Sequence, residues 1–527
     1  MNRILFALFL LSAINFFSCS KSDPGPAPVT NDNGKITVNK SSILLRAFPS
    51  MTDSIVVDAD VDWQVTVSPA ESAHWFALSK LSGAPGKNTI ILRVFDANPH
   101  PEQEVTLNFK KANTSNVLAT TKVEQTLYHL EWTKHYGGSK YDVPVAAIKS
   151  TDGGIILAGH SNSMDYDVMS PNYSLDLWIV KVDLNGQFMW RKTYGVNEIS
   201  ETAVGLSATA DGGCVVVGNY EATGPTGGES HGYTDVLVLK LNSSGQEEWH
   251  RVVGGSNSDP VHSITSVSDG IIVAATTNSS DGDVPLNSER STWLFKLDFS
   301  GNTKWSKLLK SPSFDARIKI AATKANGIVL TQNTPGGHKF STLRLDSTGN
   351  MLWEKEYGMI TKPCFPSAIV VAPGGDIFET GEFSGIEGDI TETHGSWDLW
   401  LIKLDDGGNL ISKQTFGGTG YDGGRTLSLA SDGGLLIGGQ TRSYDLDVTT
   451  NHTSSTNNLT LDCWVIKLDS GGRPLWQKSI GTSADDNCAA VVGLDNGAFA
   501  VFSDFPARDG DGIESFGYND YFLTMFK

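Results

Sequence analysis

A degenerate repeat runs through most of the chain and constrains its fold more than any other feature of the sequence. Residues 176–190 read Asp-Leu-Trp-Ile-Val-Lys-Val-Asp-Leu-Asn-Gly-Gln-Phe-Met-Trp, and related stretches stand at 293–305 and 462–476. Each runs through a tight Asn-Gly or Ser-Gly turn into a strand that opens on Trp. This opening recurs at Trp132, Trp190, Trp249, Trp305, Trp353 and Trp476, with Ile411 in place of one Trp. Successive positions lie 48 to 65 residues apart, which gives seven units, and such a period predicts an array, solenoid or propeller.

Each unit reads as four short strands. In the first unit these strands cover 145–149, 155–159, 177–181 and 189–194. Asp152-Gly153-Gly154 joins the first pair and is a strong hairpin signal, because both turn residues need positive φ. The same turn recurs at 211–213 and 432–434. Four-stranded antiparallel repeats are the unit of a β-propeller, so the sequence predicts an all-β chain with a seven-bladed β-propeller over residues 129–527.

The two ends of this region predict how the ring closes. A strand that opens on Trp, 132–136, precedes the first complete unit, and the strand 520–526 ends the chain with no such strand after it. We expect the first of these strands to complete the last blade, which leaves no exposed blade edge.

Three pieces of the first unit carry a resemblance to a known class of repeat. They are Tyr-Gly-Gly-Ser at 136–139, Thr-Asp-Gly-Gly at 151–154 and Asp-Leu-Trp-Ile-Val-Lys at 176–181. Together they resemble bacterial secreted propeller repeats of the Gly-Gly-Ser…Asp-Gly-Gly type. The resemblance covers 132–527 and implies a fold but little about activity.

The N-terminus has the features of a targeting segment. Arg3 is followed by the apolar run 4–17, which is short for a membrane span. The following Ser18-Cys19 resembles a bacterial lipobox, which implies a signal peptide over 1–19 and lipidation of Cys19; an ordinary cleaved signal peptide is the alternative. Residues 20–34 predict a flexible tether, and 20–23 loosely resemble the export signal of Bacteroidetes surface lipoproteins. We expect a membrane-anchored protein of the cell envelope, at the outer membrane and surface-exposed, with the leaflet left open.

Residues 35–128 predict a small β-domain, because period-two runs alternate with turn residues. The order Asp62-Trp63, then 75–79, 83–86, Asn98 and 123–125 resembles the BACON domain. That resemblance implies an immunoglobulin-like β-sandwich, with carbohydrate binding or a spacer role. Trp63 and Trp75 stand where the family has core tryptophans, so we expect both in the core.

Charge and cysteine content limit the possible partners. A formal net charge of −19 argues against nucleic acid, which needs a basic footprint. Besides Cys19 the chain has Cys214, Cys364, Cys463 and Cys488, whose spacing matches no zinc or redox pattern. Cys214 and Cys463 lie in apolar strand runs, where buried thiols are the default, and disulfide pairing stays open.

Function is expected on one face of the propeller, where the long connections after the second and fourth strands of each blade meet. Paired aspartates recur in these loops: Asp165 and Asp167, Asp281 and Asp283, Asp445 and Asp447. Carboxylates two residues apart suit Ca²⁺, and Asx turns are the alternative. Aromatic residues in the same loops are candidates for stacking on a sugar or protein ligand, and the three selected are Trp397, Tyr166 and Tyr444.

No catalytic residue stands out. The chain has no nucleophile elbow, metal-binding His spacing or phosphate-binding loop, and it does not reproduce the spaced arginines and acidic boxes of propeller sialidases. The expected function is therefore a non-catalytic binding or scaffolding module with a glycan or protein ligand, and not an enzyme. The alternatives are a polysaccharide-active propeller enzyme and a purely structural surface module. Carboxylates that converge with an arginine or histidine at the central pore would favour the enzyme.

Overall fold

The structure, a computed structural model, is all-β. It describes residues 34–46, 52–69, 76–94, 105–126, 128–168, 170, 174–195, 199–221, 229–310, 317–452, 460–511 and 516–527. The one helix in these ranges is the short 3₁₀ turn η2 (Asp495–Gly497), and no helix in them is long and apolar enough to cross a membrane. The signal peptide, Cys19, nearly all of the tether and Trp75 lie outside the described residues.

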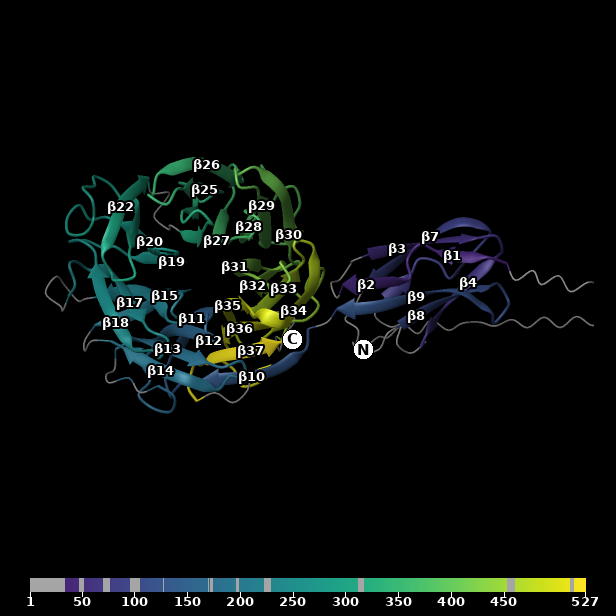
Figure 1. Cartoon of the computed structure of the whole chain (residues 1–527), viewed down its shortest axis with the longest axis horizontal. Coiled ribbons are helices and arrows are strands. Elements are labelled where there is room, and N and C mark those ends of the chain that lie inside the picture. The colour runs from purple at the N-terminus through teal and green to yellow at the C-terminus, as the bar shows by residue number, and fades with distance from the viewer. Residues whose placement is uncertain are drawn as a thin grey trace, which may run out of the picture.

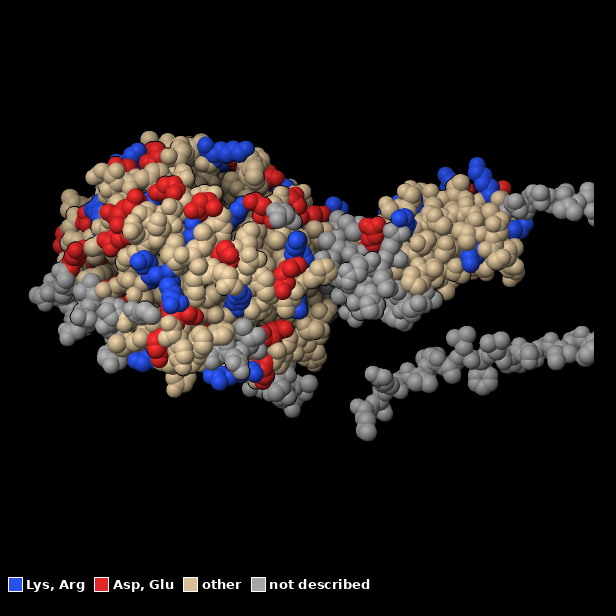
Figure 2. Space-filling view, turned by 60° about the horizontal axis from the view of Figure 1, so that its bottom comes forward, with Lys and Arg blue, Asp and Glu red and all other residues tan. Residues whose placement is uncertain are grey.

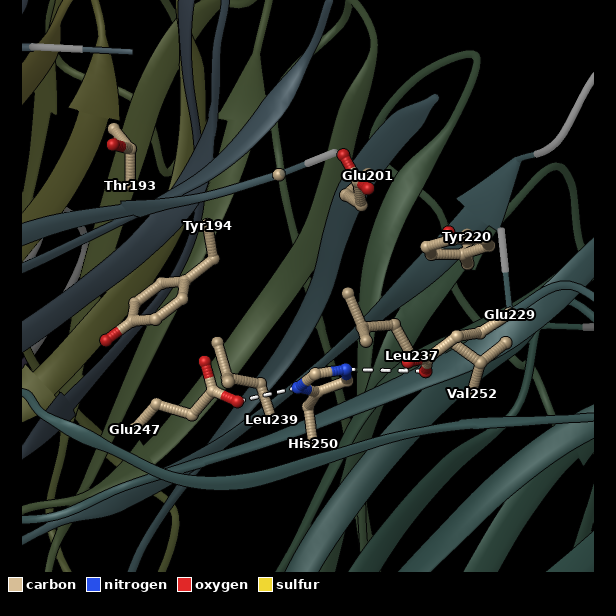
Figure 3. Close-up of a pocket in the computed structure, with 11 residues that line it drawn as sticks. Thr193, Tyr194, Glu201, Tyr220, Glu229, Leu237, Leu239, Glu247, His250 and Val252 are labelled. Carbon is tan, nitrogen blue, oxygen red and sulfur yellow. Dashed lines mark hydrogen bonds and ion pairs between the residues drawn. The ribbon is translucent and has the colours of Figure 1, made fainter. Parts of the chain in front are cut away.

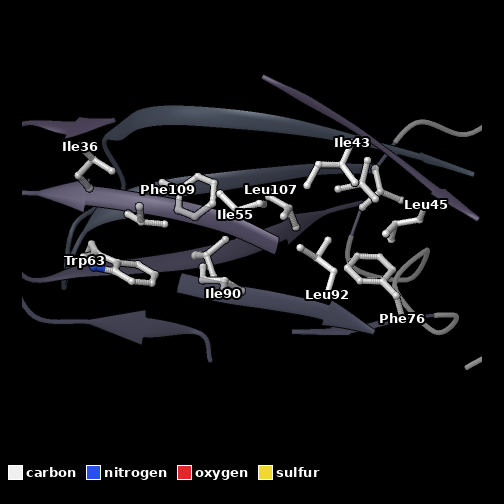
Figure 4. Packing of buried hydrophobic residues seen from close by; sticks show 14 of the residues in the cluster. Ile36, Ile43, Leu45, Ile55, Trp63, Phe76, Ile90, Leu92, Leu107 and Phe109 are labelled. Carbon is white, nitrogen blue, oxygen red and sulfur yellow. The ribbon is translucent and has the colours of Figure 1, made fainter. Parts of the chain in front are cut away.

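Two facing sheets form the N-terminal part. One contains β1 (Ile36–Val38), β3 (Thr52–Ala59), β7 (Gly86–Val94) and β5 (Phe76–Leu78), in that order. The other contains β2 (Ser42–Arg46), β9 (Val117–Thr126), β8 (Val105–Lys111), β4 (Trp63–Ser68) and β6 (Ser82–Gly83). Alternate residues of both sheets meet in one apolar core, and Figure 4 shows Trp63 within it near Ile90 and Phe109. Trp63 is fully buried, as the sequence predicted.

From residue 130 onward, the described residues form seven four-stranded antiparallel sheets. The first three are β11 (Asp142–Lys149), β12 (Ile155–Ser161), β13 (Asp176–Val182), β14 (Phe188–Tyr194); β15 (Ser200–Ala208), β16 (Cys214–Glu221), β17 (Thr234–Leu241), β18 (Glu247–Val253); and β19 (Val261–Val267), β20 (Gly270–Thr277), β21 (Ser291–Leu297), β22 (Thr303–Lys310). The next two are β23 (Lys319–Ala322), β24 (Ile328–Asn333), β25 (Lys339–Leu345), β26 (Met351–Gly358); and β27 (Cys364–Val371), β28 (Ile377–Phe383), β29 (Asp398–Leu404), β30 (Leu410–Phe416). The last two are β31 (Asp422–Leu429), β32 (Leu435–Thr441), β33 (Asp462–Leu468), β34 (Pro474–Ile480); and β35 (Asn487–Gly493), β36 (Phe499–Asp504), β37 (Tyr521–Phe526), β10 (Leu130–Tyr136).

These sheets stand in a ring (Figure 1), with the first strand of each sheet innermost. The first strands contact one another in the order β11, β15, β19, β23, β27, β31 and β35, and β35 contacts β11 again. In the last sheet, β10 pairs antiparallel with β37, with Trp132 opposite Met525. The predicted pairing of an N-terminal strand with the C-terminal strand is therefore confirmed, and it joins the two ends of the ring.

A buried lysine explains why the Asp-Gly-Gly turn and the Lys of the third strand recur together. The Lys467 ammonium is almost completely buried, lies 2.8 Å from the Asp432 carboxylate and also donates to the Leu468 carbonyl. The same pair is formed by Lys181 with Asp152, Lys240 with Asp211 and Lys296 with Asp269. Each aspartate sits in the hairpin turn between the first and second strands, so each pair fixes that turn against the third strand.

The tryptophan that opens the fourth strand joins one sheet to the next. Trp190 donates its indole N–H to the Ser243 carbonyl at 2.9 Å, in the turn that follows the third strand of the next sheet. Gly245 of that turn has φ +72°, and a Cβ there would lie 2.6 Å from the Trp190 ring. Equivalent bonds run from Trp249 to Phe299, Trp305 to Ser347 and Trp353 to Asp406. The repeated Trp and the repeated turn Gly therefore recur together because the indole ring packs directly against the glycine of the next sheet.

The second glycine of the Asp-Gly-Gly turn has a different role from the one expected. Both glycines have positive φ at 153–154, but at 211–213 and 432–434 only the first does. A Cβ on Gly213 would lie 2.1 Å from the Leu241 carbonyl oxygen, and one on Gly434 would lie 2.2 Å from the Leu468 carbonyl oxygen. Close approach of the third strand therefore requires this second glycine.

The four cysteines in the described ranges, Cys214, Cys364, Cys463 and Cys488, are all buried and none forms a disulfide. Burial raises the pKa of the Cys214 thiol to about 12. This agrees with the predicted role of Cys214 and Cys463 as apolar core residues.

The Lys467–Asp432 pair gives a stability prediction. Asp432→Ala leaves a buried ammonium without its carboxylate, which costs about 3–5 kcal/mol in fully buried pairs. Because the Asp432 side chain is 46% exposed, we expect a loss below that range, about 2–3 kcal/mol, in urea unfolding. The double variant Lys467→Met/Asp432→Ala should recover most of the loss. Asp495→Ala, at an exposed ion pair with Lys149, is the matched control, and an equal loss there would contradict the account.

Glu379 gives a pH prediction. This residue of β28 is fully buried and accepts hydrogen bonds from the Thr342 hydroxyl, and burial raises its pKa to about 7 from the ordinary 4.5. Its protonated form therefore favours folding, and this stability is lost as pH rises from about 4.5 through 7. Relative to wild type, Glu379→Gln should gain about 3 kcal/mol of unfolding free energy between pH 5 and pH 8. Glu289→Gln, on an exposed loop, should show no such gain.

Candidate functional site

A narrow channel runs through the centre of the ring. Six innermost strands carry a register shift at the same place, which leaves one residue unpaired in each: Val145, Val204, His262, Ser367, Arg425 and Ala489. All six side chains line a channel cavity of about 250 Å³. A β-bulge re-aims a side chain, so this repeated bulge decides which residues face the channel.

The channel mouth on the long-loop side is basic. A cavity of about 390 Å³ there is lined by His262, Arg317, Lys319 and Arg425, together with Pro366 and Ser367. Lys319 has no carboxylate within ion-pair distance among the described residues, and burial and the Arg317 charge lower its pKa. Burial likewise lowers the pKa of His262 to about 4, so its imidazole is neutral at pH 7. This cavity has an excess of positive charge although the whole chain carries −19.

The two arginines of this cavity hold a tyrosine–glutamate pair at its rim. Tyr421, just before β31, donates its hydroxyl hydrogen bond to the Glu382 carboxylate near the end of β28. Arg317 contacts the other Glu382 oxygen at 2.7 Å, and Arg425 donates to the Tyr421 hydroxyl at 2.8 Å. Glu382 is only 5% exposed, whereas the arginines are about one third exposed.

Burial and the Glu382 charge raise the pKa of the Tyr421 phenol, while Arg425 and Arg317 act in the opposite direction. The phenol is therefore protonated at pH 7 and lies directly beside a carboxylate that can accept its proton. Once the proton has moved, the two guanidinium groups stabilise the phenolate. A phenol activated in this way can serve as a nucleophile or as an acid–base group. The guanidinium groups can also bind a substrate carboxylate or sulfate.

An aromatic cluster borders this group and includes Trp397. The Trp397 ring is stacked on Phe365, with centroids 6.1 Å apart, and lies 6.4 Å from the Tyr421 ring. The Arg317 guanidinium lies 4.8 Å above the Phe365 ring. Trp397, one of the three proposed ligand-binding residues, is half-buried. Its contacts with Phe365 and Tyr421 place it at the border of the channel mouth.

The other two proposed ligand-binding residues lie on separate exposed loops. Tyr166 is 58% exposed and stacked on Phe516, with centroids 4.5 Å apart. Tyr444 is 54% exposed. Tyr166 lies on the loop after β12, and Tyr444 lies on the loop after β32, in the same sheet as the strand that follows Tyr421. The structure brings neither into contact with the Tyr421–Glu382 pair.

The proposed calcium ligands occupy three separate junctions between sheets. The first aspartate of each pair accepts a backbone N–H: Asp165 from Ser139, Asp281 from Ser256 and Asp445 from Thr419. Of the second aspartates, Asp167 pairs with Arg191 and Asp283 pairs with Arg251, whereas Asp447 accepts a hydrogen bond from the Gly417 N–H. Each of these contacts joins residues far apart in the chain across a junction, which differs from the local bond of an Asx turn. In the described ranges no three His, Cys, Asp or Glu side chains converge as a metal site, and calcium binding stays a prediction.

Comparisons with known proteins show likeness of fold. No protein-family model matches the chain, and no curated protein matches it in sequence. Among solved structures, an ulvan lyase from a new polysaccharide lyase family, bound to a GlcA(1-4)Rha3S ligand, is 9% identical with a TM-score of 0.44, covering 74% of this chain and 94% of its own. The phage phi92 endosialidase is 10% identical with a TM-score of 0.40, and the match covers 79% of this chain and 71% of the endosialidase. The NanB sialidase of Streptococcus pneumoniae is 10% identical with a TM-score of 0.38 and coverages of 90% and 83%.

The expectation of a non-catalytic binding or scaffolding module, and of no enzyme, is corrected. The similar solved structures include a polysaccharide lyase and sialidases rather than binding modules alone. The structure brings one carboxylate, Glu382, to Arg317 and Arg425 beside the central channel, where several carboxylates were expected to mark an enzyme.

Sequence reasoning missed Arg317, Glu382, Tyr421 and Arg425, although one signal was present. The channel-facing bulge position holds small or apolar residues in the other sheets, such as Val145, but His262 and Arg425 in two. Packing of the ring does not require a charged side chain at a position where the other sheets have a small one, so such a residue indicates a function.

The Tyr421–Glu382 contact can be tested by titration. Glu382→Gln removes the negative charge beside the phenol and leaves the guanidinium groups of Arg317 and Arg425 in place. We therefore expect the Tyr421 pKa to fall relative to wild type, as followed by ¹⁹F NMR of 3-fluorotyrosine-labelled protein with Tyr421→Phe to assign the resonance. Glu356→Gln, at an exposed ion pair with Lys339, should leave the resonance unchanged. An unaltered Tyr421 titration in Glu382→Gln would show that the two groups are not coupled.

Proposed function

We propose that this chain is a glycan-active enzyme that cleaves an anionic polysaccharide at the channel mouth. The observation that carries the proposal is the Tyr421 hydroxyl bonded to the Glu382 carboxylate, with Arg317 and Arg425 on both sides and an open basic cavity beside them.

The basic cavity supports an anionic sugar as the bound group. Arg317, Lys319 and Arg425 supply three cations around the cavity, and Glu382 is the one carboxylate within ion-pair distance of them among the described residues. A uronate carboxylate or a sugar sulfate would offset part of this excess positive charge and accept bidentate hydrogen bonds. The half-buried Trp397 ring, stacked on Phe365 on one side, is suited to sugar stacking on its other face.

Tyr421 is the proposed reacting group. Glu382 accepts the phenolic proton as the phenol oxygen bonds to the anomeric carbon and the glycosidic C–O bond breaks, with water protonating the leaving oxygen. The two arginines stabilise the charge that develops. Tyrosine nucleophiles are known among glycoside hydrolases, and a phenolate can instead abstract a proton next to a uronate carboxylate. The two reactions leave different products, since hydrolysis yields a saturated end and elimination yields an unsaturated one.

Activity should be tested on the full chain with polyuronates, sulfated polysaccharides and sialylated glycans, with new reducing ends and absorbance at 235 nm as readouts. We expect cleavage of an acidic glycan, and Tyr421→Phe and Glu382→Gln should each lower kcat about 100-fold or more. Arg425→Gln should mainly raise KM for the acidic substrate. Tyr444→Phe is the matched control and should keep full activity. Cleavage that survives Tyr421→Phe, or cleavage of neutral glycans alone, would refute the proposal.

We also propose that the ring is a seven-bladed β-propeller over 129–527 and that 35–128 is an immunoglobulin-like, BACON-like sandwich. Seven four-stranded sheets in cyclic contact and two facing sheets around one core support these assignments. The sequence pattern ending at Cys19 supports a lipid anchor and a cell-envelope location. Such an anchor would hold the enzyme where extracellular polysaccharide arrives.

A further inference from the structure

A second cavity lies between two neighbouring sheets, away from the channel. It has a volume of about 470 Å³ and lies between the end of β14 and the strands β15 to β18. None of its lining residues lines the channel mouth, so it is a separate site.

The walls of this cavity are largely apolar. Leu237 and Leu239 of β17 and Val252 of β18 contribute aliphatic surface. Tyr194 presents its ring, because its hydroxyl already donates to the Gly245 carbonyl at 2.8 Å. A ligand in this cavity would therefore contact hydrocarbon and aromatic surface over most of its body.

The polar groups of the cavity are predominantly acidic. His250 is bonded to Glu247 at 2.6 Å through one ring nitrogen and lies 3.3 Å from Glu229 through the other, and Figure 3 shows it between these two carboxylates. The Glu247 hydrogen bond and both glutamate charges raise the pKa of His250. Glu201, 1% exposed, adds a third carboxylate to the lining. Among the described residues, Glu229 and Glu247 place two carboxylates against one imidazolium, which makes this part of the cavity negative.

We propose that this cavity is a binding site for an organic cation that joins an ammonium group to an apolar body. The apolar walls accept the body, and the carboxylates of Glu229 and Glu247 attract the ammonium group. Surface acidity alone would favour any cation, but the hydrocarbon walls select against small hydrated ions. In Figure 2, acidic and basic side chains are interspersed over the visible surface.

The test uses three probes of similar shape and different charge on the full chain, by isothermal titration calorimetry at pH 7.5. We expect 2-phenylethylammonium to bind, 2-phenylethanol to bind at least about tenfold more weakly and 3-phenylpropanoate to show no binding. Equal affinity for the amine and the alcohol would overturn the proposal, and so would an absence of amine binding.

The double variant Glu229→Gln/Glu247→Gln locates the interaction. Both side chains are partly exposed, so the variant should fold, and its affinity for the amine should fall about tenfold or more. Glu289→Gln, on an exposed loop of another sheet, is the control and should bind like wild type. Amine binding that is unchanged in the double variant would place the ligand elsewhere and refute the site.

Discussion

The ring depends on one repeated contact, the indole N–H that the fourth strands of the first four sheets donate to a turn carbonyl of the next sheet. Because Trp190 reaches Ser243 in the following sheet, each of these sheets is attached to its neighbour at its outer edge, where strands otherwise diverge. The buried Lys467–Asp432 type of pair fixes the inner hairpin of the same sheet. Both contacts involve the short turns, so the opposite face is free to vary in its loops.

Because the short turns hold the ring together, the innermost strands and the long loops can carry the candidate site. The innermost strands are held in cyclic contact, and their common bulge directs one side chain of each into the channel. Function can then be changed by substituting that residue without altering the ring, as Arg425 and His262 illustrate. Glu382 and Tyr421 stand at strand ends on the variable face, where a charge or a hydroxyl can be added without disturbing the core.

The sequence predicted the repeat, the strands, the hairpins and the N- to C-terminal strand pairing, because each follows from local periodicity and turn chemistry. It did not predict the site, because Arg317, Glu382 and Tyr421 come from three different units and meet only when the ring closes. Trp397 was singled out as the tryptophan outside the repeat positions, and the structure places it beside Tyr421. The recurring aspartate pairs, such as Asp165 and Asp167, were predicted as calcium ligands because they recur. In the structure, the first aspartate of each pair accepts a backbone N–H at a junction between sheets. A residue that recurs in every unit serves the common fold, whereas the residues of the candidate site occur in single units and differ from their counterparts in the others.

The central claim is that the channel mouth binds an anionic sugar, and a crystal structure of the Tyr421→Phe variant soaked with a uronate-containing oligosaccharide tests it most directly. The account predicts electron density for the sugar at the channel mouth, with its carboxylate contacting Arg317 and Arg425 and a ring near Trp397. An empty channel mouth at saturating ligand, or sugar bound only on the loops of Tyr166 and Tyr444, would contradict it.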